Sequence, residues 1–308
     1  MIKYHKTVDG ILTQIENYEE DCWINVTSPN DIETAGLIEM FDLDPDFIRA
    51  SLDEEESSRI ESEDGNTLII IDAPVAESGK DEVIYSTAPL GIIVTPKNVI
   101  TISLRENIII NGFCQGFVRG VCTNMKTRFV LQIMLRVATH FLQYLKQIDK
   151  ISINLERQLR KSMKNKELIE LLDLQKSLVY FSTSLKSDET TIEKLIRGRF
   201  LKMYEEDRDL ADDVLVEIKQ AIEMSSIYLN ILSGTMDAFA SVISNNLNIV
   251  MKIMASITIV ISIPNIIAGI YGMNVDGIPF NKHFWFPVAL AGGLMVVVGW
   301  ILHKKDML

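Results

Sequence analysis

A row of polar and small side chains runs into the most apolar part of this 308-residue sequence. Alternate steps of four and three residues from Asp237 stay on one face of a helix. The members of the row are Asp237, Ser241, Ser244, Asn248, Met251, Ala255, Thr258, Ser262, Asn265 and Gly269. Small and hydroxyl residues are typical of closely packed membrane helices. The amides of Asn248 and Asn265 are costlier to bury, which favours a path for an ion or polar solute. We expect the row to face a water-filled pore.

Two methionines suggest how such a pore would close. Met251 belongs to the row, and Met254 follows one turn later on a neighbouring row. Both side chains are apolar and flexible. A ring of them predicts a hydrophobic constriction that gates by dewetting.

Two apolar segments lie near the C-terminus. Residues 249–270 contain a single charged residue, Lys252, and residues 284–302 contain none. Each is close to the ~20 residues that cross ~30 Å of hydrocarbon. Buried helices of a soluble core are the alternative, but aromatic residues flank the segments as they do at membrane interfaces. These residues are Tyr271, Phe284, Trp285 and Trp300. The sequence therefore predicts two membrane spans.

The basic residues predict the orientation of these spans. Lys252 begins the first span, Lys304 and Lys305 follow the second, and only Lys282 lies between them. Because positive residues favour the cytoplasmic side, we expect a multi-pass protein of the cell membrane with both termini in the cytoplasm.

Charge and composition exclude several functions. The first hundred residues carry 22 Asp and Glu against 6 Lys and Arg. This acidic part suits cations and argues against nucleic acid as a partner, because phosphate binding needs basic patches. The three cysteines form no CxxC pair, and the four histidines are scattered. With no phosphate-binding glycine loop and no nucleophile–base motif, we expect no enzyme.

The polar body is predicted to be an α/β domain followed by long helices. Residues 22–26, 67–75 and 90–103 are β-rich, and Pro96-Lys97-Asn98 breaks the last run as a hairpin would. Residues 28–56 favour helix, with Ser28 and Asn30 as candidate caps. Residues 126–200 contain one Gly and no Pro, which indicates long helices.

A single helix is expected to link this body to the membrane. Residues 207–270 contain no Pro before Pro264, and ~60 helical residues would extend ~90 Å. Their apolar residues recur at the spacing of a packed seam, which predicts an oligomer. The expected parts are an acidic α/β domain (1–115), a helical hairpin (116–206), the stalk helix (207–270), an extracellular loop (271–283), a second span (284–302) and a basic tail (303–308).

These features together resemble the CorA family of magnesium transporters, or 2-TM-GxN metal ion transporters. The resemblance rests on "AGIYGMN" (Ala268 to Asn274), the two terminal spans and the acidic domain on a long helix. It implies a funnel-shaped homopentamer with five stalk helices around one pore and the second spans outside. It implies Mg²⁺ uptake across the cell membrane, with Co²⁺ or Ni²⁺ as further ions.

The resemblance also assigns site residues. Gly272, Met273 and Asn274 match the selectivity triplet. Mg²⁺ gives up its water reluctantly, and the Asn274 carbonyl can accept hydrogen bonds from metal-bound water. The ordinary alternative for Asn274 is a helix C-cap. The resemblance implies pore positions at Asp237, Asn248, Met251 and Gly269, and at Met254 and Asn265, where the residue type varies in the family. The polar row adds Ser244, Thr258 and Ser262 as expected pore-lining residues. Asp276 would attract cations at the outer loop, and Lys304 and Lys305 resemble a basic cluster near the cytoplasmic mouth.

The family further implies closure by intracellular Mg²⁺ bound between acidic residues of neighbouring subunits. Asp213 matches the acid on the stalk helix, but the partner position holds Ala50. Asp53 and Glu54, followed by two further glutamates, are the candidate substitutes. Weak feedback, with this charge run simply solvated, is the alternative.

Two other functions remain open at this stage. A related branch uses the same scaffold for Zn²⁺, although its triplet usually has another middle residue than Met273. A non-conducting, membrane-anchored coiled-coil sensor is the second, but it needs no inward-facing Thr258 or Asn265.

Overall fold

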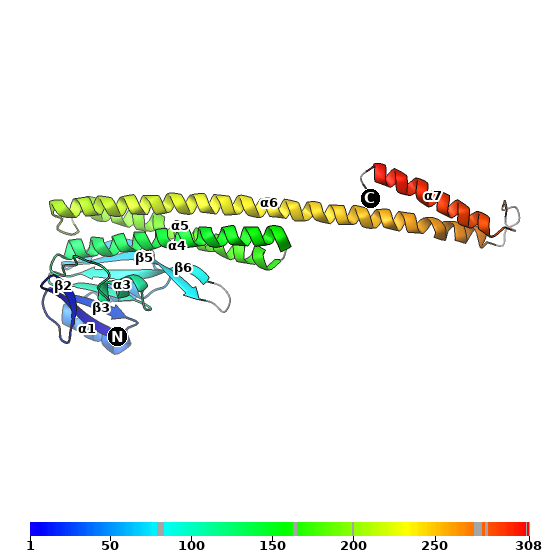
Figure 1. Ribbon diagram of the computed structural model, residues 1–308. Coiled ribbons are helices and arrows are strands. Elements are labelled where there is room, and N and C mark those ends of the chain that lie inside the picture. The colour runs from blue at the N-terminus through cyan, green and yellow to red at the C-terminus, as the bar shows by residue number, and fades with distance from the viewer. Residues whose placement is uncertain are drawn as a thin grey trace. The chain divides into compact units, whose positions relative to one another are not determined.

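The computed structural model describes residues 1–78, 83–162, 165–198, 200–273, 279–280, 283–305 and 307. The chain divides into two compact units, Met1–Gly234 and Thr235–Leu308. The boundary falls inside one helix, α6, which runs from Glu205 to Tyr271 (Figure 1). The chain therefore has a mixed α/β unit, a long helix and two C-terminal apolar helices.

A seven-stranded sheet forms the centre of the first unit. Its order is β2-β1-β3-β7-β6-β5-β4, and only β3 and β7 are parallel neighbours. The strands are β1 (Ile2–Val8), β2 (Ile11–Ile15), β3 (Trp23–Thr27), β4 (Arg59–Glu63), β5 (Asn66–Ser78), β6 (Val83–Val94) and β7 (Val99–Ser103). The hairpin expected at residues 96–98 is confirmed, because the Thr95 N–H donates to the Asn98 carbonyl at 2.9 Å between β6 and β7.

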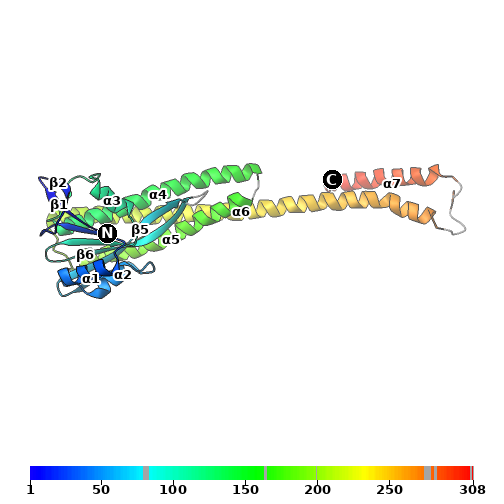
Figure 2. The same cartoon turned by 90° about the horizontal axis from the view of Figure 1, so that it is seen from below.

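Helices cover both faces of this sheet (Figures 1 and 2). On one face lie α1 (Asp31–Phe41) and α2 (Pro45–Ser51); on the other lie α4 (Lys126–Ser162) and α5 (Asn165–Arg197), with the short α3 (Ile108–Cys114) beside α4. Aromatic rings fill the α4 side. The Trp23 ring lies 5.2 Å from Phe129, and Phe141 of α4 lies 5.0 Å from Phe181 of α5. Edge contacts of this kind fix the two long helices on the sheet.

The helical segment expected at residues 28–56 is two helices rather than one. Asn30 caps α1, and its side chain accepts from the Glu33 N–H at 2.8 Å. Ser28 does not act as a cap; it takes a left-handed conformation with φ of 45°. Asp42 ends α1, also left-handed, and Asp44 caps α2. Helices often end at a left-handed glycine, but here Asp42 takes that conformation, so no glycine marks the end of α1 in the sequence.

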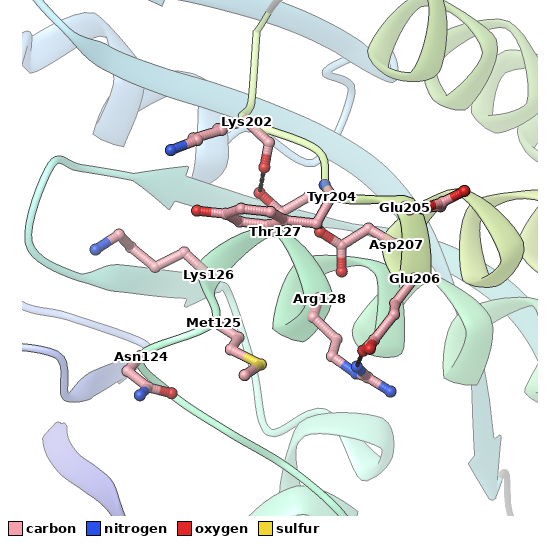
Figure 3. Close-up of a pocket in the computed structure, with 10 residues that line it drawn as sticks. All are labelled: Asn124, Met125, Lys126, Thr127, Arg128, Lys202, Tyr204, Glu205, Glu206 and Asp207. Carbon is pink, nitrogen blue, oxygen red and sulfur yellow. Dashed lines mark hydrogen bonds and ion pairs between the residues drawn. The ribbon is translucent and has the colours of Figure 1, made fainter.

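The start of α6 is attached to the start of α4 at a pocket of about 650 Å³ (Figure 3). The Thr127 hydroxyl of α4 donates to the Lys202 carbonyl at 2.8 Å, and Arg128 pairs with Glu206 at 2.8 Å. Buried Asp207 accepts a backbone N–H at the entrance of α6. Acidic residues suit the positive end of a helix, so α6 begins at Glu205 rather than at residue 207.

Only part of the expected apolar seam is buried in the single chain. Ile218, Leu232 and Phe239 are buried, whereas Leu247 and Val250 are exposed. In the first unit, α6 is also held to α5 by polar contacts. The Ser225 hydroxyl donates to the Leu178 carbonyl at 3.2 Å.

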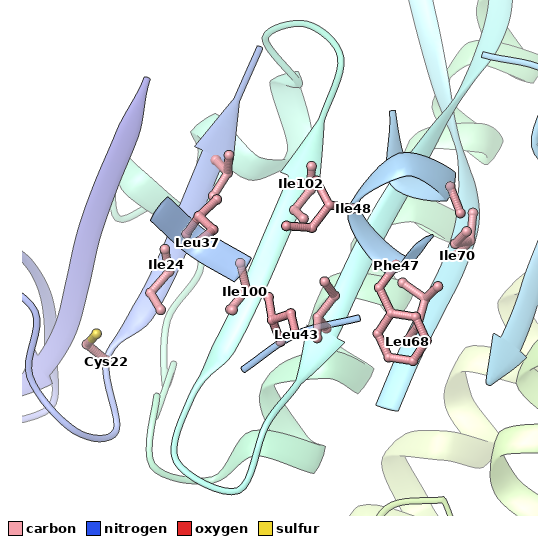
Figure 4. Packing of buried hydrophobic residues seen from close by; sticks show 13 residues of the cluster. Cys22, Ile24, Leu37, Leu43, Phe47, Ile48, Leu68, Ile70, Ile100 and Ile102 are labelled. Atoms are coloured by element: carbon pink, nitrogen blue, oxygen red, sulfur yellow. The ribbon is translucent and has the colours of Figure 1, made fainter. Parts of the chain in front are cut away.

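The layer formed by α1 and α2 rests on a dense apolar cluster (Figure 4). Leu37, Leu43, Phe47 and Ile48 of this layer lie against side chains of β3, β5 and β7. Burying each such side chain contributes roughly 1.5–3 kcal/mol relative to leaving it exposed. The close approach of α2 to β6 needs Gly91, because a Cβ there would lie 2.4 Å from the Cβ of Ser51.

We expect Gly91→Ala to lower the free energy of unfolding of the first unit by about 1–3 kcal/mol, because α2 must move away. The matched control is Gly36→Ala in α1, where an added Cβ meets nothing within 4 Å. Denaturant unfolding followed by the fluorescence of buried Trp23, in a Trp285→Phe, Trp300→Phe background, measures both. Equal midpoints for the two variants would contradict this account of the contact.

Candidate permeation pathway

The second unit consists of two apolar helices. It contains the C-terminal part of α6, followed by α7 (Trp285–Lys304), and both helices are long and apolar enough to cross a membrane. Their large side chains are mostly exposed in the single chain; Ile257 is 41% exposed and Val296 is 73% exposed. Apolar surface of this extent needs lipid or further protein copies to cover it.

The polar row lies along α6 and is accessible in the single chain. Asp237, Ser244, Asn248, Met251, Met254, Thr258, Asn265 and Gly269 are exposed, and Ser262 is half-buried. Because all nine are on one continuous helix, their helical spacing holds: eight form one stripe, and Met254 lies on the neighbouring row. The side-chain amides of Asn248 and Asn265 are exposed in the single chain and thus open to water or to another copy.

The hydroxyl groups of the row donate to their own helix. Ser241 donates to the Asp237 carbonyl at 3.0 Å, Thr258 to the Met254 carbonyl at 2.8 Å and Ser262 to the Thr258 carbonyl at 2.7 Å. A hydroxyl that has given its proton keeps lone pairs as acceptors. This face therefore offers acceptors outward, which suits a ligand that brings hydrogen-bond donors.

The helix α6 ends at the start of the triplet. Gly272 N–H donates to the Ala268 carbonyl at 2.9 Å, and Met273 N–H donates to the Ile270 carbonyl at 3.3 Å. Asn274 and Asp276 lie outside the described residues. An aromatic contact joins the described ends of this connection, since the Tyr271 ring at the end of α6 lies 6.4 Å from the Phe286 ring of α7.

The basic residues at the end of the chain do not begin a separate tail at residue 303. Lys304 is in the last turn of α7 and Lys305 is its C-cap, as favoured at the negative end of a helix. Beyond them, the Met307 carbonyl accepts a hydrogen bond from fully buried Ser256 of α6 at 2.8 Å. Sequence analysis missed Ser256, which lies off the polar row and gives no signal of its own.

The expected regulatory acids are not gathered into a metal site within one chain. Asp53, Glu54 and Asp213 are all exposed, and Glu54 pairs with Arg105 at 3.2 Å. Across the described part of the chain, no group of three or more His, Cys, Asp or Glu residues could hold a metal ion. Ala50, at the family's partner position, is buried.

Comparison with known proteins decides the family. A model described as CorA-like Mg²⁺ transporter protein matches residues 19–304. The chain belongs to this family. The CorA family consists of membrane transporters rather than enzymes, which agrees with the expected family and with the expectation that the protein is not an enzyme. The apolar stretches of α6 and α7 are suited to anchoring the chain in a membrane.

Individual relatives span nearly the whole chain. The cobalt/magnesium transport protein CorA of Methanocaldococcus jannaschii is 27% identical over 295 residues, covering 92% of this chain and 90% of that protein. The protein of the same name from Thermotoga maritima is 23% identical, covering 92% and 82%. The complete structure of the CorA magnesium transporter from M. jannaschii matches with a TM-score of 0.81 at 24% identity, covering 99% and 96% of the two chains.

If the row faces water in the CorA-like assembly, single cysteines there will react with a water-soluble thiol reagent. We expect Thr258→Cys and Ser262→Cys to be labelled at least about tenfold faster than Ile257→Cys, which is 100° away around the helix. Ile257 is exposed in the single chain, so its labelling rate differs from that of the row only if the assembled membrane protein covers it with lipid or protein. The background replaces half-buried Cys114 and Cys122 and keeps buried Cys22. Equal labelling of the three positions would contradict a wet row.

Proposed function

We propose that this protein is a channel or transporter that carries Mg²⁺ into the cell, with Co²⁺ and Ni²⁺ as further ions. Its working form is a funnel-shaped homopentamer in which α6 lines a central pore and α7 lies outside. The observation that carries the proposal is the row of polar and small residues on one face of an unbroken apolar helix in a CorA family member. The names of the M. jannaschii and T. maritima relatives, both cobalt/magnesium transport proteins, support the ion class.

The row suits a cation that keeps its water. Mg²⁺ dehydrates reluctantly and usually retains several water molecules when it binds protein. Those waters are strong hydrogen-bond donors, and the hydroxyls of Thr258 and Ser262 have acceptor lone pairs left for them. The amides of Asn248 and Asn265 add carbonyl acceptors. Because these groups carry no charge, the ion can enter and still leave.

We assign ion selection to the triplet and the loop after it. Five Asn274 carboxamides around an axis would accept from the water shell of a dication without the tight hold of a carboxylate ring. Gly272 and Met273 shape the end of the helix beneath them, and Asp276 attracts cations to the mouth. Met251 and Met254, both exposed on α6, would form the hydrophobic gate.

The basic residues support an orientation with both termini in the cytoplasm. Lys304 and Lys305 are exposed at the end of α7, and Lys252 precedes the apolar stretch of α6. Positive residues favour the cytoplasmic side of a membrane. The acidic α/β unit is then on the same side, where intracellular Mg²⁺ would reach it.

For control of the pore, we propose a weakened form of closure by intracellular Mg²⁺. Asp213 is exposed on α6 and available to a neighbouring subunit. Asp53 and Glu54 follow α2, but Arg105 neutralises Glu54, and Asp53 accepts from the Glu55 N–H at 3.0 Å. A divalent cation bridging subunits would have to compete with these contacts, so we expect modest affinity.

The sharpest test of the transport function is Mg²⁺ flux into liposomes that contain the purified protein. We expect Asn274→Ala to lower the flux about tenfold or more, the effect of losing ~1.4 kcal/mol of hydrogen bonding to the hydrated ion. The matched control is Asn246→Ala, on the opposite side of α6 from the row, which should leave flux unchanged. A zinc transporter would instead show faster Zn²⁺ than Mg²⁺ flux, and a sensor would show none.

Limited proteolysis of the full-length protein tests the regulatory role of Asp213. Mg²⁺ should slow cleavage of the wild type, and Asp213→Ala should lose most of this protection because one side of the bridge is gone. Asp212→Ala removes the neighbouring exposed charge and should keep the protection. Full protection of Asp213→Ala by Mg²⁺ would reject Asp213 as a ligand.

A further inference from the structure

Asp188 is a carboxylic acid buried inside the first unit. It lies on α5 and is 1% exposed. Its Oδ1 atom accepts from the Ser58 hydroxyl at 2.7 Å and from the Asp72 backbone N–H at 2.9 Å. The pairing of β4 with β5 ends at Arg59 and Ile70, so Asp188 takes over as acceptor for β5 where β4 stops. The side chain thereby attaches α5 to the edge of the sheet.

The other oxygen of this carboxyl group has no partner. The Oδ2 atom of Asp188 is buried and makes no hydrogen bond to any described residue. A buried carboxylate without a counterion costs several kcal/mol. Such a group ordinarily lowers this cost by taking up a proton.

No basic side chain in the described surroundings compensates Asp188. Arg59 of β4 pairs with Glu56 at 3.4 Å and with Glu61 at 2.8 Å. Lys219 of α6 is 3.8 Å from Glu189 and 3.7 Å from Glu193, two half-buried acids of α5 that face α6. The charged group that acts on Asp188 is another acid, Asp72 of β5.

We propose that Asp188 is a proton-binding site that holds one proton at neutral pH. The proton is on Oδ2, the oxygen that has no partner among the described residues, while Oδ1 continues to accept from Ser58 and β5. The buried carboxyl group is then neutral. This site goes beyond ion transport and gives the α/β unit a response to protons.

Electrostatics agrees with this geometry. Burial raises the pKa of Asp188 well above its usual range, and the charge of Asp72 raises it further. Burial also raises the pKa of Asp72, against a hydrogen bond from Ser184 that lowers it. Because the folded-state pKa values exceed the unfolded ones, the native unit holds more protons, and its stability falls as pH rises toward the folded-state pKa. Proton loss thus weakens the attachment of α5, whose Glu189 and Glu193 contact Lys219 of α6.

The test measures the unfolding equilibrium of the full-length protein in detergent from about pH 5 to about pH 9. A Trp285→Phe, Trp300→Phe background leaves the fluorescence of Trp23 as the reporter of the first unit. The unfolding equilibrium constant should rise by up to about tenfold per pH unit as long as the native state keeps the proton that unfolding releases, and it should level off above the folded-state pKa. Asp188→Asn supplies a permanent donor and should flatten this slope. Asp173→Asn removes an exposed acid of α5 and should keep the wild-type slope. Identical slopes in Asp188→Asn and wild type would overturn the proposal.

A second measurement detects the proton directly in the wild type, and a comparison with Mg²⁺ separates a proton from a metal ion. Infrared spectra of the wild type at neutral pH should show the carbonyl stretch of a protonated carboxyl group, and Asp72→Asn should shift its loss to another pH. Absence of this band at neutral pH would overturn the proposal. So would Mg²⁺-dependent stabilisation at alkaline pH that Asp188→Asn abolishes, because a cation would then occupy the site.

Discussion

A polar group on an apolar helix needs a polar partner, and this constraint governs the membrane part of the protein. The backbone of α6 satisfies its own hydrogen bonds, so the helix itself tolerates hydrocarbon. Its hydroxyls donate to carbonyls one turn back, whereas the exposed amides of Asn248 and Asn265 need water or another polar partner. The proposed arrangement of α6 copies around a wet axis would supply that water. In the same proposal the apolar surface of α7 faces lipid.

The α/β unit provides the fixed end of this long helix. Contacts from Thr127 and Arg128 attach the start of α6 to α4, and Ser225 joins it to α5. The helix α5 is in turn attached to the sheet edge by Asp188. These contacts connect the sheet to α6 without a gap. A structural change in the sheet, caused by ions at its acidic surface or by a proton at Asp188, can therefore be transmitted to α6.

Sequence patterns predicted the elements whose cause is local. The apolar spans, the hairpin at residues 96–98 and the cap at Asn30 follow from hydropathy and turn chemistry, and the structure has all three. Patterns failed where tertiary contacts decide, as at buried Ser256 and Asp188, which resemble ordinary helix surface residues in the sequence. The break between α1 and α2 was missed although Asp44 and Pro45 signal a new helix start, because no glycine marks the end of α1 at Asp42. The roles of Asn274 and Asp276 stay predictions, since both residues lie outside the described part of the chain.

The most direct measurement is an experimental structure of the assembled protein in a lipid bilayer, with ordered water resolved. The account predicts five copies whose Thr258, Ser262 and Asn265 side chains line a hydrated central axis, with Asn274 at the mouth. A resolved assembly that turns these side chains toward lipid, or buries them in a dry contact between subunits, would contradict it.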